Sequence, residues 1–394
     1  MLFPEAIPIL APLGPWFETV KRTLPWRAAD LDAFHPDPYA VLVSEVMLQQ
    51  TQVATVVPYF QRWMARFPTL AALAAAGEDE VHGLWAGLGY YRRARNLHRA
   101  AALLARDGWP RDLDGLLALP GLGPYTAAAL AAQAFQWPTP ALDGNAFRVA
   151  ARLLALEGDP RRAAAELRAW LRPALAAHGP SRLTQAIMEL GATLCAPAPR
   201  CADCPLRTAC RARQQGSVQR IPPALPRARP AEMELHLVAV ESKAGWLLRP
   251  PARTGLLAGL WSWPAVPARL DPAALGAAEA AVQYRAAEGR AWPGWVQAYS
   301  HLRQSVHPLG VRLDTVPAAP EGLAWVPDRD LAGLPMGRRD QRLRELLARP
   351  ATMLPLDEEA WRAVQAVLAG AADAPVPGRP GRSRSPAGSD AARR

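Results

Sequence analysis

The stretch that most constrains the fold of this chain is Leu119-Pro120-Gly121-Leu122-Gly123-Pro124-Tyr125-Thr126. Pro-Gly-x-Gly after an apolar residue, followed by mostly small helix formers, predicts a helix, a tight turn and a second helix. Gly121 and Gly123 permit a positive φ and let another backbone approach closely. The free N–H groups of the turn lie at a helix N-terminus, where an anion such as a DNA phosphate binds well. An ordinary glycine-rich turn between packed helices is the alternative.

The length and charge of the chain set its broad class. A chain of 394 residues is too long for one typical domain, so we expect two. The net charge is +10, and Lys21 and Lys243 are the only lysines, so arginine supplies nearly all of the positive charge. A GC-rich genome explains the preference for arginine over lysine but not the sign of the net charge. A basic chain suits a polyanionic partner.

The sequence also indicates the cellular compartment, and with it the state of the four cysteines, which lie close together in the sequence. No apolar run of about 18 residues predicts a membrane span, and the N-terminus lacks the features of a signal peptide. We therefore expect a cytoplasmic protein, associated with the nucleoid in a bacterium, whose cysteines are ligands or thiols rather than disulfides. The pattern Cys195-x5-Cys201-x2-Cys204-x5-Cys210 is a strong ligand signal. Four thiolates suit an iron–sulfur cluster and a zinc ion equally well, and the spacing leaves both open.

Apolar periodicity predicts a helical domain over residues 1–213, closed by the cysteine loop at 195–210. The expected helices cover 39–50, 53–67, 81–88, 94–104, 113–119, 126–135, 146–156, 161–177 and 183–194. A proline-rich linker is predicted at 214–231, and a smaller α+β domain at 232–349. Strands are expected there at 233–241, 246–248, 297–301, 306–313 and 323–326, with a helix at 340–348. The Arg/Pro-rich tail, 350–394, is predicted to be largely disordered apart from a weak helix at 357–369.

Two carboxylates stand in contexts that suit acid–base chemistry. Glu45 lies within an apolar helix, where a carboxyl group has either a partner or a raised pKa and can then donate a proton near neutral pH. Asp143 precedes Gly144-Asn145 and the start of a helix. Two carboxylates with separated pKa values suit cleavage of a glycosidic bond through an oxocarbenium-like state. The alternatives are a helix-surface glutamate and a plain helix N-cap.

Residues 16–213 resemble the helix-hairpin-helix DNA glycosylase superfamily with a C-terminal iron–sulfur loop, and most closely its adenine DNA glycosylase family. The motifs that carry the resemblance are Leu24-Pro25-Trp26-Arg27, Ser44-Glu45-Val46-Met47-Leu48-Gln49-Gln50-Thr51-Gln52-Val53, Gly87-Leu88-Gly89-Tyr90-Tyr91, Leu119-Pro120-Gly121-Leu122-Gly123 and Leu142-Asp143-Gly144-Asn145. The second domain resembles the Nudix-like C-terminal domain of this family through Gly255-Leu256-Leu257-Ala258-Gly259-Leu260-Trp261-Ser262-Trp263-Pro264 and Tyr299-Ser300-His301-Leu302. Together the resemblance covers about residues 16–349.

The resemblance implies removal of adenine mispaired with 8-oxoguanine or guanine in double-stranded DNA, by an enzyme that flips the base from the stack. Glu45 would protonate adenine N7 and later activate water, and Asp143 would stabilise the sugar cation, with Tyr125 and Asn145 in support. The family match further implies a [4Fe-4S] cluster, and we expect a monomer. Lysine scarcity predicts a monofunctional enzyme, because strand-cutting relatives use an amine where this chain has Tyr125.

The resemblance also assigns binding residues to this chain. The adenine pocket would be lined by Arg22, Leu24, Trp26 and Glu189. The lesion and its opposite gap would be contacted by Gln50, Thr51, Leu88 and Tyr90. Gly121, Gly123 and Tyr125 would meet the DNA backbone, while Tyr299, Ser300 and His301 would sense 8-oxoguanine. Several of these positions would equally suit core or surface residues.

Three features depart from the family pattern. The first cysteine spacing is x5 where the family usually has x6, residues 28–36 form an insertion, and Tyr299 replaces the usual Phe. Residues 264–290 lack the glutamate-rich box of an active Nudix hydrolase, so nucleotide hydrolysis is not expected. The alternatives to adenine excision are another mismatch glycosylase of the superfamily, such as a thymine-releasing one, and a non-catalytic helix-hairpin-helix DNA-binding protein.

Overall fold

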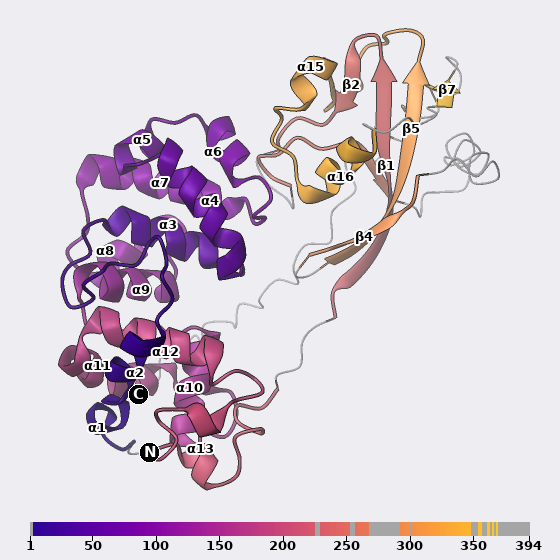
Figure 1. The fold of residues 1–394 in the computed structure, drawn as a ribbon. Helices are drawn as coiled ribbons and strands as arrows, with labels where there is room; N and C mark the ends of the chain where they lie inside the picture. The colour runs from indigo at the N-terminus through magenta and orange to yellow at the C-terminus, as the bar shows by residue number, and fades with distance from the viewer. Residues whose placement is uncertain are drawn as a thin grey trace, which may run out of the picture. The chain divides into compact units, whose positions relative to one another are not determined.

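The computed structural model describes residues 3–224, 229–252, 257–267, 292–299, 302–347 and 354–356, together with residues 361, 362, 365 and 368. The chain divides into two compact units, Met1–Pro226 and Arg227–Arg394. The boundary between them falls within the proline-rich segment 214–231. The first unit is helical, and the second is built on a mixed β-sheet (Figure 1).

The helical unit consists of short to medium helices joined by tight connections. They are α1 (Ala6–Leu10), α2 (Leu13–Val20), α3 (Pro38–Leu48), α4 (Val53–Arg66), α5 (Leu70–Ala74), α6 (Glu78–Trp85), α7 (Arg92–Asp107), α8 (Leu113–Leu117), α9 (Pro124–Phe135), α10 (Gly144–Leu154), α11 (Ala164–His178), α12 (Pro180–Thr193) and α13 (Arg211–Gln214), with 3₁₀ turns η1 (Pro160–Ala163) and η2 (Cys201–Asp203).

Two hydrophobic cores organise this unit. Helices α3 to α9 enclose the first core, which includes the fully buried Trp63 and Trp85. Helices α1, α2, α10, α11 and α12 enclose the second, around Phe17 and Leu175. The two groups occupy opposite ends of the unit in Figure 1. Helix α9 contacts α3 in one group and α12 in the other, so it joins the two cores.

The N-terminal segment differs from the sequence expectation, which placed no helix before residue 39. Both α1 and α2 form despite Pro8, Pro12 and Pro15. Pro8 and Pro15 lie in the first turn of their helices, and Pro12 is the N-cap of α2, so none removes a hydrogen bond from a helix interior. The short α5 was also not predicted.

Several predicted helices end earlier than expected, for local reasons. Helix α8 ends at Leu117 rather than at 119, because Pro120 disfavours helical backbone at the residue before it. Helix α10 ends at Leu154 rather than at 156, because Ala155 adopts a left-handed φ of 52°. The segment predicted as one helix over 161–177 divides into η1 and α11.

The second unit contains a mixed sheet in the order β4-β5-β1-β2-β6. Its strands are β1 (Ala231–Ser242), β2 (Gly245–Leu248), β4 (Trp295–Ala298), β5 (Leu302–Leu313) and β6 (Ala324–Val326), with β3 (Ala265–Pro267) paired to β1 and β7 (Leu354–Leu356) paired to β5. The long central pair, β1 and β5, is parallel, while β1 and β2 form the predicted antiparallel hairpin. Gly245 has a φ of 111° and lies against the backbone of Val326, so this turn requires glycine.

Apolar side chains cover both faces of the sheet. The short α15 (Asp328–Leu331) and α16 (Arg338–Leu347) contribute Leu331 and Leu343 to the core on one face. Trp361 and Leu368 pack into the core on the other face, so the unit continues past residue 349. Strand β4 begins two residues before the predicted 297 and ends at Ala298. The remainder of the tail, Gly255, Leu256, Ser300 and His301 lie outside the described residues.

Candidate active site

Glu45 lies near the middle of α3, a helix that is buried on almost every side. Only 5% of the residue is exposed. Its carboxylate oxygen Oε1 accepts a hydrogen bond of 2.7 Å from Nε2 of Gln133 on α9, and the Tyr125 side chain supplies another. The alternative of a helix-surface glutamate is therefore wrong, and the carboxyl group is held between two helices.

Burial changes the acidity of this carboxyl group. Loss of hydration, with a smaller contribution from the nearby charge of Asp143, raises the pKa of Glu45 from 4.5 to about 7. The hydrogen bonds from Gln133 and Tyr125 act in the opposite direction but do not cancel the effect of burial. Glu45 is thus poised to hold or release a proton near neutral pH.

Asp143 is the N-cap of α10 and also faces the buried acid. Its Oδ1 accepts a 2.6 Å hydrogen bond from the backbone N–H of Ala146, and its Oδ2 accepts one of 3.1 Å from Nδ2 of Asn145. The predicted N-cap is therefore present. Because the charge of Asp143 acts on both Glu45 and Tyr125, the fold brings the two carboxylates and the phenol into one site.

Tyr125 connects the hairpin to this site. It follows Pro124 in the first turn of α9, and its hydroxyl is hydrogen-bonded to Glu45. Gly121 has a φ of 82° and packs against Asn96, as a hairpin glycine should. Gly123 differs from the prediction, because it is the extended N-cap of α9 and its φ is negative. An added Cβ at Gly123 would meet nothing within 4 Å, so the helix N-terminus is open to an approaching group.

The predicted pocket residues 22–26 pack beside α12. Arg22 donates two hydrogen bonds to the buried carboxylate of Glu189, at 2.6 and 3.1 Å. Arg27, which the sequence analysis did not place in the site, lies 3.6 Å from Glu189 and donates to Gln185 at 2.7 Å. Trp26 is buried with its ring 5.2 Å from that of Phe60, and Leu24 is partly buried at the edge of the same core.

The predicted lesion-contacting residues lie on two loops that the structure brings together. Gln50 and Thr51 follow α3, while Leu88 and Tyr90 follow α6. The guanidinium of Arg93 donates to Oγ1 of Thr51 at 3.3 Å and to the carbonyl of Leu88 at 3.2 Å. Tyr90 is 45% exposed, and it is therefore available for contact.

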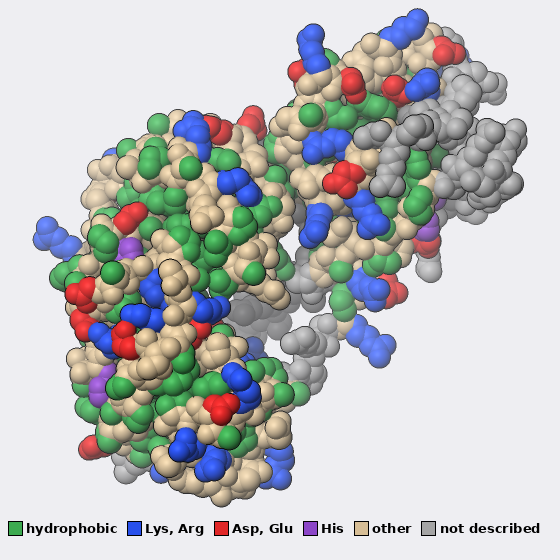
Figure 2. Space-filling model, viewed as in Figure 1, with side chains coloured by type: hydrophobic (Ala, Val, Ile, Leu, Met, Phe, Trp, Pro, Cys, Tyr) green, Lys and Arg blue, Asp and Glu red, His purple; other side chains and the backbone are tan. Residues whose placement is uncertain are grey.

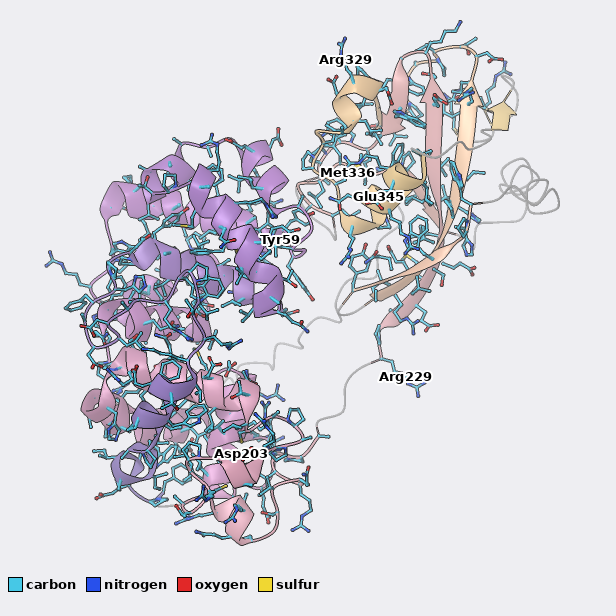
Figure 3. All side chains as sticks on the ribbon, in the orientation of Figure 1. Tyr59, Asp203, Arg229, Arg329, Met336 and Glu345 are labelled. Atoms are coloured by element: carbon cyan, nitrogen blue, oxygen red, sulfur yellow. The ribbon has the colours of Figure 1, made fainter. Side chains whose placement is uncertain are left out.

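The four cysteines form a loop that α10 holds in place. None is in a disulfide, and all are half-buried. Burial raises the pKa of Cys204 to about 11, and the other three thiols also contribute to that rise, so the four lie close enough to interact. Asp203, labelled in Figure 3, lies on η2 between Cys201 and Cys204. Among the residues that the structure describes, no three His, Cys, Asp or Glu side chains are grouped as around a single metal ion.

Two arginines on α10 link the cysteine loop to the acid site. Arg148 donates to the carbonyl of Cys195 at 2.7 Å and to Oδ1 of Asn145 at 2.7 Å. Arg152, one turn later, donates to the carbonyl of Ala196 at 2.7 Å and lies 3.5 Å from Sγ of Cys195. Asn145 in turn holds Asp143, so one helix connects the loop to the carboxylate.

Gln133, Arg148 and Arg152 belong to the site but were not predicted from the sequence. Gln133 is the polar residue in a run of alanines on α9, which is the signal that could have revealed a buried partner for Glu45. The spacing of Arg148 and Arg152 places both on one face of α10, but nothing in the sequence says that the cysteine loop lies against that face.

The second unit carries the predicted reader residue Tyr299 beside a buried ion pair. Its backbone N–H donates to the carbonyl of Leu302 at 2.7 Å, and burial raises the pKa of its phenol to about 12. The charges of Arg339 and Asp340, which pair at 3.0 Å, both act on that phenol. Asp340 also accepts a hydrogen bond of 2.9 Å from the backbone of Trp263, so both family motifs meet at α16.

Basic side chains gather over the part of the helical unit that carries α13 (Figure 2). The exposed arginines near α13 in the sequence include Arg200, Arg207, Arg211 and Arg213. Such a surface favours contact with a polyanion. Within the described residues, no helix has both the length and the apolar character that a bilayer crossing requires.

Comparison with known proteins identifies the family. Residues 43–173 match the family model of the HhH-GPD superfamily base excision DNA repair proteins. Adenine DNA glycosylase of Homo sapiens is 34% identical over 380 residues, which cover 79% of this chain and 68% of the human protein. That of Mus musculus is 34% identical over 79% of this chain and 72% of its own length. That of Mycolicibacterium smegmatis is 43% identical over 51% of this chain and 68% of its own length.

The chain belongs to the adenine DNA glycosylase family. It is therefore an adenine-specific base-excision repair enzyme, a hydrolase, and DNA is its substrate. This confirms the family and the activity that the sequence motifs indicate. The alternatives of thymine release and of a non-catalytic DNA-binding protein are set aside.

The raised pKa of Glu45 predicts how the free energy of unfolding depends on pH. The ionised carboxylate destabilises the fold, and this effect is absent below pH 4.5, grows as pH rises toward about 7, and is complete above it. Glu45→Gln removes the charge. We expect its free energy of unfolding to exceed that of the wild type by about 3 kcal/mol at pH 8, with almost no difference at pH 4.5. Urea unfolding at both pH values measures this.

The matched control is Glu166→Gln, because Glu166 is an exposed glutamate on α11. Its effect on unfolding should be small at both pH values. A Glu45→Gln effect of the same size at pH 4.5 and pH 8 would contradict the raised pKa.

Proposed function

We propose that this enzyme flips adenine out of duplex DNA opposite 8-oxoguanine or guanine and hydrolyses its glycosidic bond, leaving an abasic site. The observation that carries the proposal is the pairing of a buried, protonatable Glu45 with a second carboxylate, Asp143, in one site. Two carboxyl groups in environments this different suit separate roles in glycosidic cleavage.

Glu45 is the proposed general acid. With a pKa of about 7, a large fraction of the group is protonated at neutral pH and can donate to N7 of the flipped adenine. Protonation makes the base a neutral leaving group. The ionised Glu45 then accepts a proton from the attacking water, and Gln133 keeps its carboxylate oriented through the 2.7 Å hydrogen bond.

Asp143 is the proposed stabiliser of the sugar cation. The hydrogen bonds from Ala146 and Asn145 hold its carboxylate in one orientation, which favours a stabilising contact formed as charge develops. Asn145 is itself held by Arg148. Tyr125 supports the acid through its hydrogen bond to Glu45, and in this place no lysine amine is available for a Schiff base. The enzyme is therefore proposed to be monofunctional.

The adenine pocket is proposed to lie around Arg22, Leu24, Trp26 and Glu189. The bidentate contact between Arg22 and Glu189 fixes a buried carboxylate, which can accept hydrogen bonds from an adenine edge. Arg27 lies 3.6 Å from Glu189 and adds a second cation beside that carboxylate. Gly121, Gly123 and Tyr125 would place the α9 N-terminus against a DNA phosphate.

The cysteine loop is proposed to hold a [4Fe-4S] cluster through Cys195, Cys201, Cys204 and Cys210. Four thiols in one loop, none in a disulfide, match the donor set of such a cluster. Arg148 and Arg152 hold the carbonyls of the loop, and the nearby guanidinium of Arg152 suits a thiolate at Cys195. The cluster would have a structural role and would hold the loop against α10.

The cluster assignment predicts the metal content of the protein. Anaerobically purified protein should contain iron and acid-labile sulfide in equal amounts and should absorb in the visible range, because thiolate-bound iron–sulfur clusters are coloured. Elemental analysis and an absorption spectrum measure this. Stoichiometric zinc without iron in the native protein would overturn the assignment.

The proposed acid predicts a rate effect. Glu45→Gln should bind mispaired DNA yet release adenine roughly 10²–10⁴-fold more slowly, because an amide cannot deliver the proton. The wild-type rate should fall as pH rises through about 7, where Glu45 loses its proton. Single-turnover kinetics on an 8-oxoguanine:adenine duplex is the measurement, with Glu166→Gln as control. Turnover near the wild-type rate would refute the role.

The second unit is proposed to be a Nudix-like lesion reader. The resemblance of Tyr299-Ser300-His301 to the family motif and the buried pair beneath Tyr299 support this proposal. A hydroxyl and an imidazole can read the N7–H and O8 groups that distinguish 8-oxoguanine from guanine. The unit would act on recognition rather than on bond cleavage.

The lesion reader predicts a change in preference. Ser300→Ala with His301→Ala should narrow the preference for 8-oxoguanine:adenine over guanine:adenine, because a site built to hydrogen-bond a feature penalises its absence. The effect on affinity should exceed the effect on the single-turnover rate. Both quantities are measured on both duplexes, and a double variant that keeps the wild-type preference would exclude these residues as the reader.

A further inference from the structure

Two loops of the helical unit, Gln49–Thr51 and Leu88–Tyr90, each hold an exposed residue in the uncommon left-handed backbone conformation. Gln50 has a φ of 58° and Tyr90 a φ of 51°. Gln50 follows the end of α3, where a left-handed residue is usual, but Tyr90 lies five residues past the end of α6 and two before α7. A bulky aromatic residue rarely adopts the left-handed backbone conformation, and it does so only where neighbouring contacts hold it there.

Arg93 supplies those surroundings. It is the second residue of α7 and only 8% of it is exposed. One guanidinium nitrogen, Nη1, donates to the carbonyl oxygens of Val46 at 3.0 Å, Met47 at 2.9 Å and Gln49. The other, Nη2, donates to Thr51 Oγ1 at 3.3 Å and to the carbonyl oxygens of Leu88 and Gly89, both at 3.2 Å.

The same side chain also fixes Tyr90. Its guanidinium lies 5.3 Å from the centre of the Tyr90 ring and 5.3 Å from that of Trp85, and its backbone N–H donates to the Tyr90 carbonyl at 2.8 Å. Tyr59, labelled in Figure 3, anchors the start of the second loop by donating from its hydroxyl to the carbonyl of Ala86 at 2.9 Å. The two loops are therefore tied to each other through one planar group.

No carboxylate among the described residues pairs with Arg93. Burial lowers its pKa to about 10, and the partly negative C-terminal end of α3 and two aromatic rings are what oppose the loss of hydration. The planar guanidinium has N–H groups that point in fixed directions, and this geometry is needed to reach carbonyls of both loops at once. A lysine ammonium cannot reproduce it.

We propose that Arg93 is a positioning residue that locks the Gln49–Thr51 and Leu88–Tyr90 loops together, so that the pair meets the mispair in one prepared conformation. The lock sets how strongly the enzyme prefers a lesion-containing duplex. This role in preference rests on the proposed contact of Gln50 and Tyr90 with the lesion. Without the lock, the loops must be ordered on binding, which weakens the specific complex.

Arg93→Lys keeps the charge and removes the fork, and Arg92→Lys, at the exposed neighbouring position, is the matched control. Hydrogen exchange of the free protein should show faster exchange of amides 49–51 and 88–91 together in Arg93→Lys only. The ratio of dissociation constants for matched and 8-oxoguanine:adenine duplexes should fall by about tenfold, and by more than the single-turnover rate falls. Faster exchange in one loop alone, or an unchanged ratio, would overturn the proposal.

If Arg93→Lys fails to fold, Thr51→Val tests the proposal instead. It deletes one hydrogen-bond acceptor of Arg93 with little change in side-chain shape. Faster exchange at 88–91, a loop that does not contain residue 51, supports the lock, and unchanged exchange there overturns it.

Tyr90→Ala separates the two proposals. If it leaves the duplex preference intact while Arg93→Lys loosens both loops, the lock stands and the assignment of Tyr90 to the lesion fails.

Discussion

A carboxyl group buried where two helical cores meet is the constraint on which the helical unit depends. Glu45 can keep a proton near neutral pH only if water is excluded, so α3 must be covered on nearly all sides. The alanine-rich α9 provides that cover, because its small side chains let α3 and α12 approach on different faces. Gln133 interrupts the alanines where the acid needs a donor.

The second carboxylate is placed by a different device, a helix N-terminus tied to a distant loop. Helix α10 begins with Asp143 and Asn145, and its next two turns carry Arg148 and Arg152 against the cysteine loop. The loop and the carboxylate are therefore connected through one helix of 11 residues, because Arg148 and Arg152 hold the loop and Asn145 holds Asp143. A ligand held by the four cysteines would therefore also stabilise the geometry of the acid site.

Much of this could be predicted from sequence, because the strongest signals are local. Helical periodicity located α3, α4, α7 and α9, and the apolar setting of Glu45 indicated either a partner or a raised pKa, both of which the structure has. The sequence did not indicate α1 and α2, since prolines that suit a first turn look like helix breakers. Nor did it indicate the partners Gln133, Arg93 and Arg148, because their contacts join segments that only the tertiary fold brings together. The negative φ of Gly123 likewise depends on its role as an N-cap.

Two ionisable side chains are buried in or against helix α3, with Glu45 within the helix and Arg93, from α7, at its C-terminal end. Among the described residues, no cation pairs with Glu45 and no carboxylate pairs with Arg93. Both lower the stability of the free protein, as expected where function requires a strained site. In the proposed reaction the flipped adenine receives the proton of Glu45, so the protonated base would itself be the cation that the Glu45 carboxylate lacks in the free protein. A matched internal cation beside Glu45 would stabilise the fold, but it would lower the pKa of the carboxyl group and leave no proton to donate in the proposed reaction.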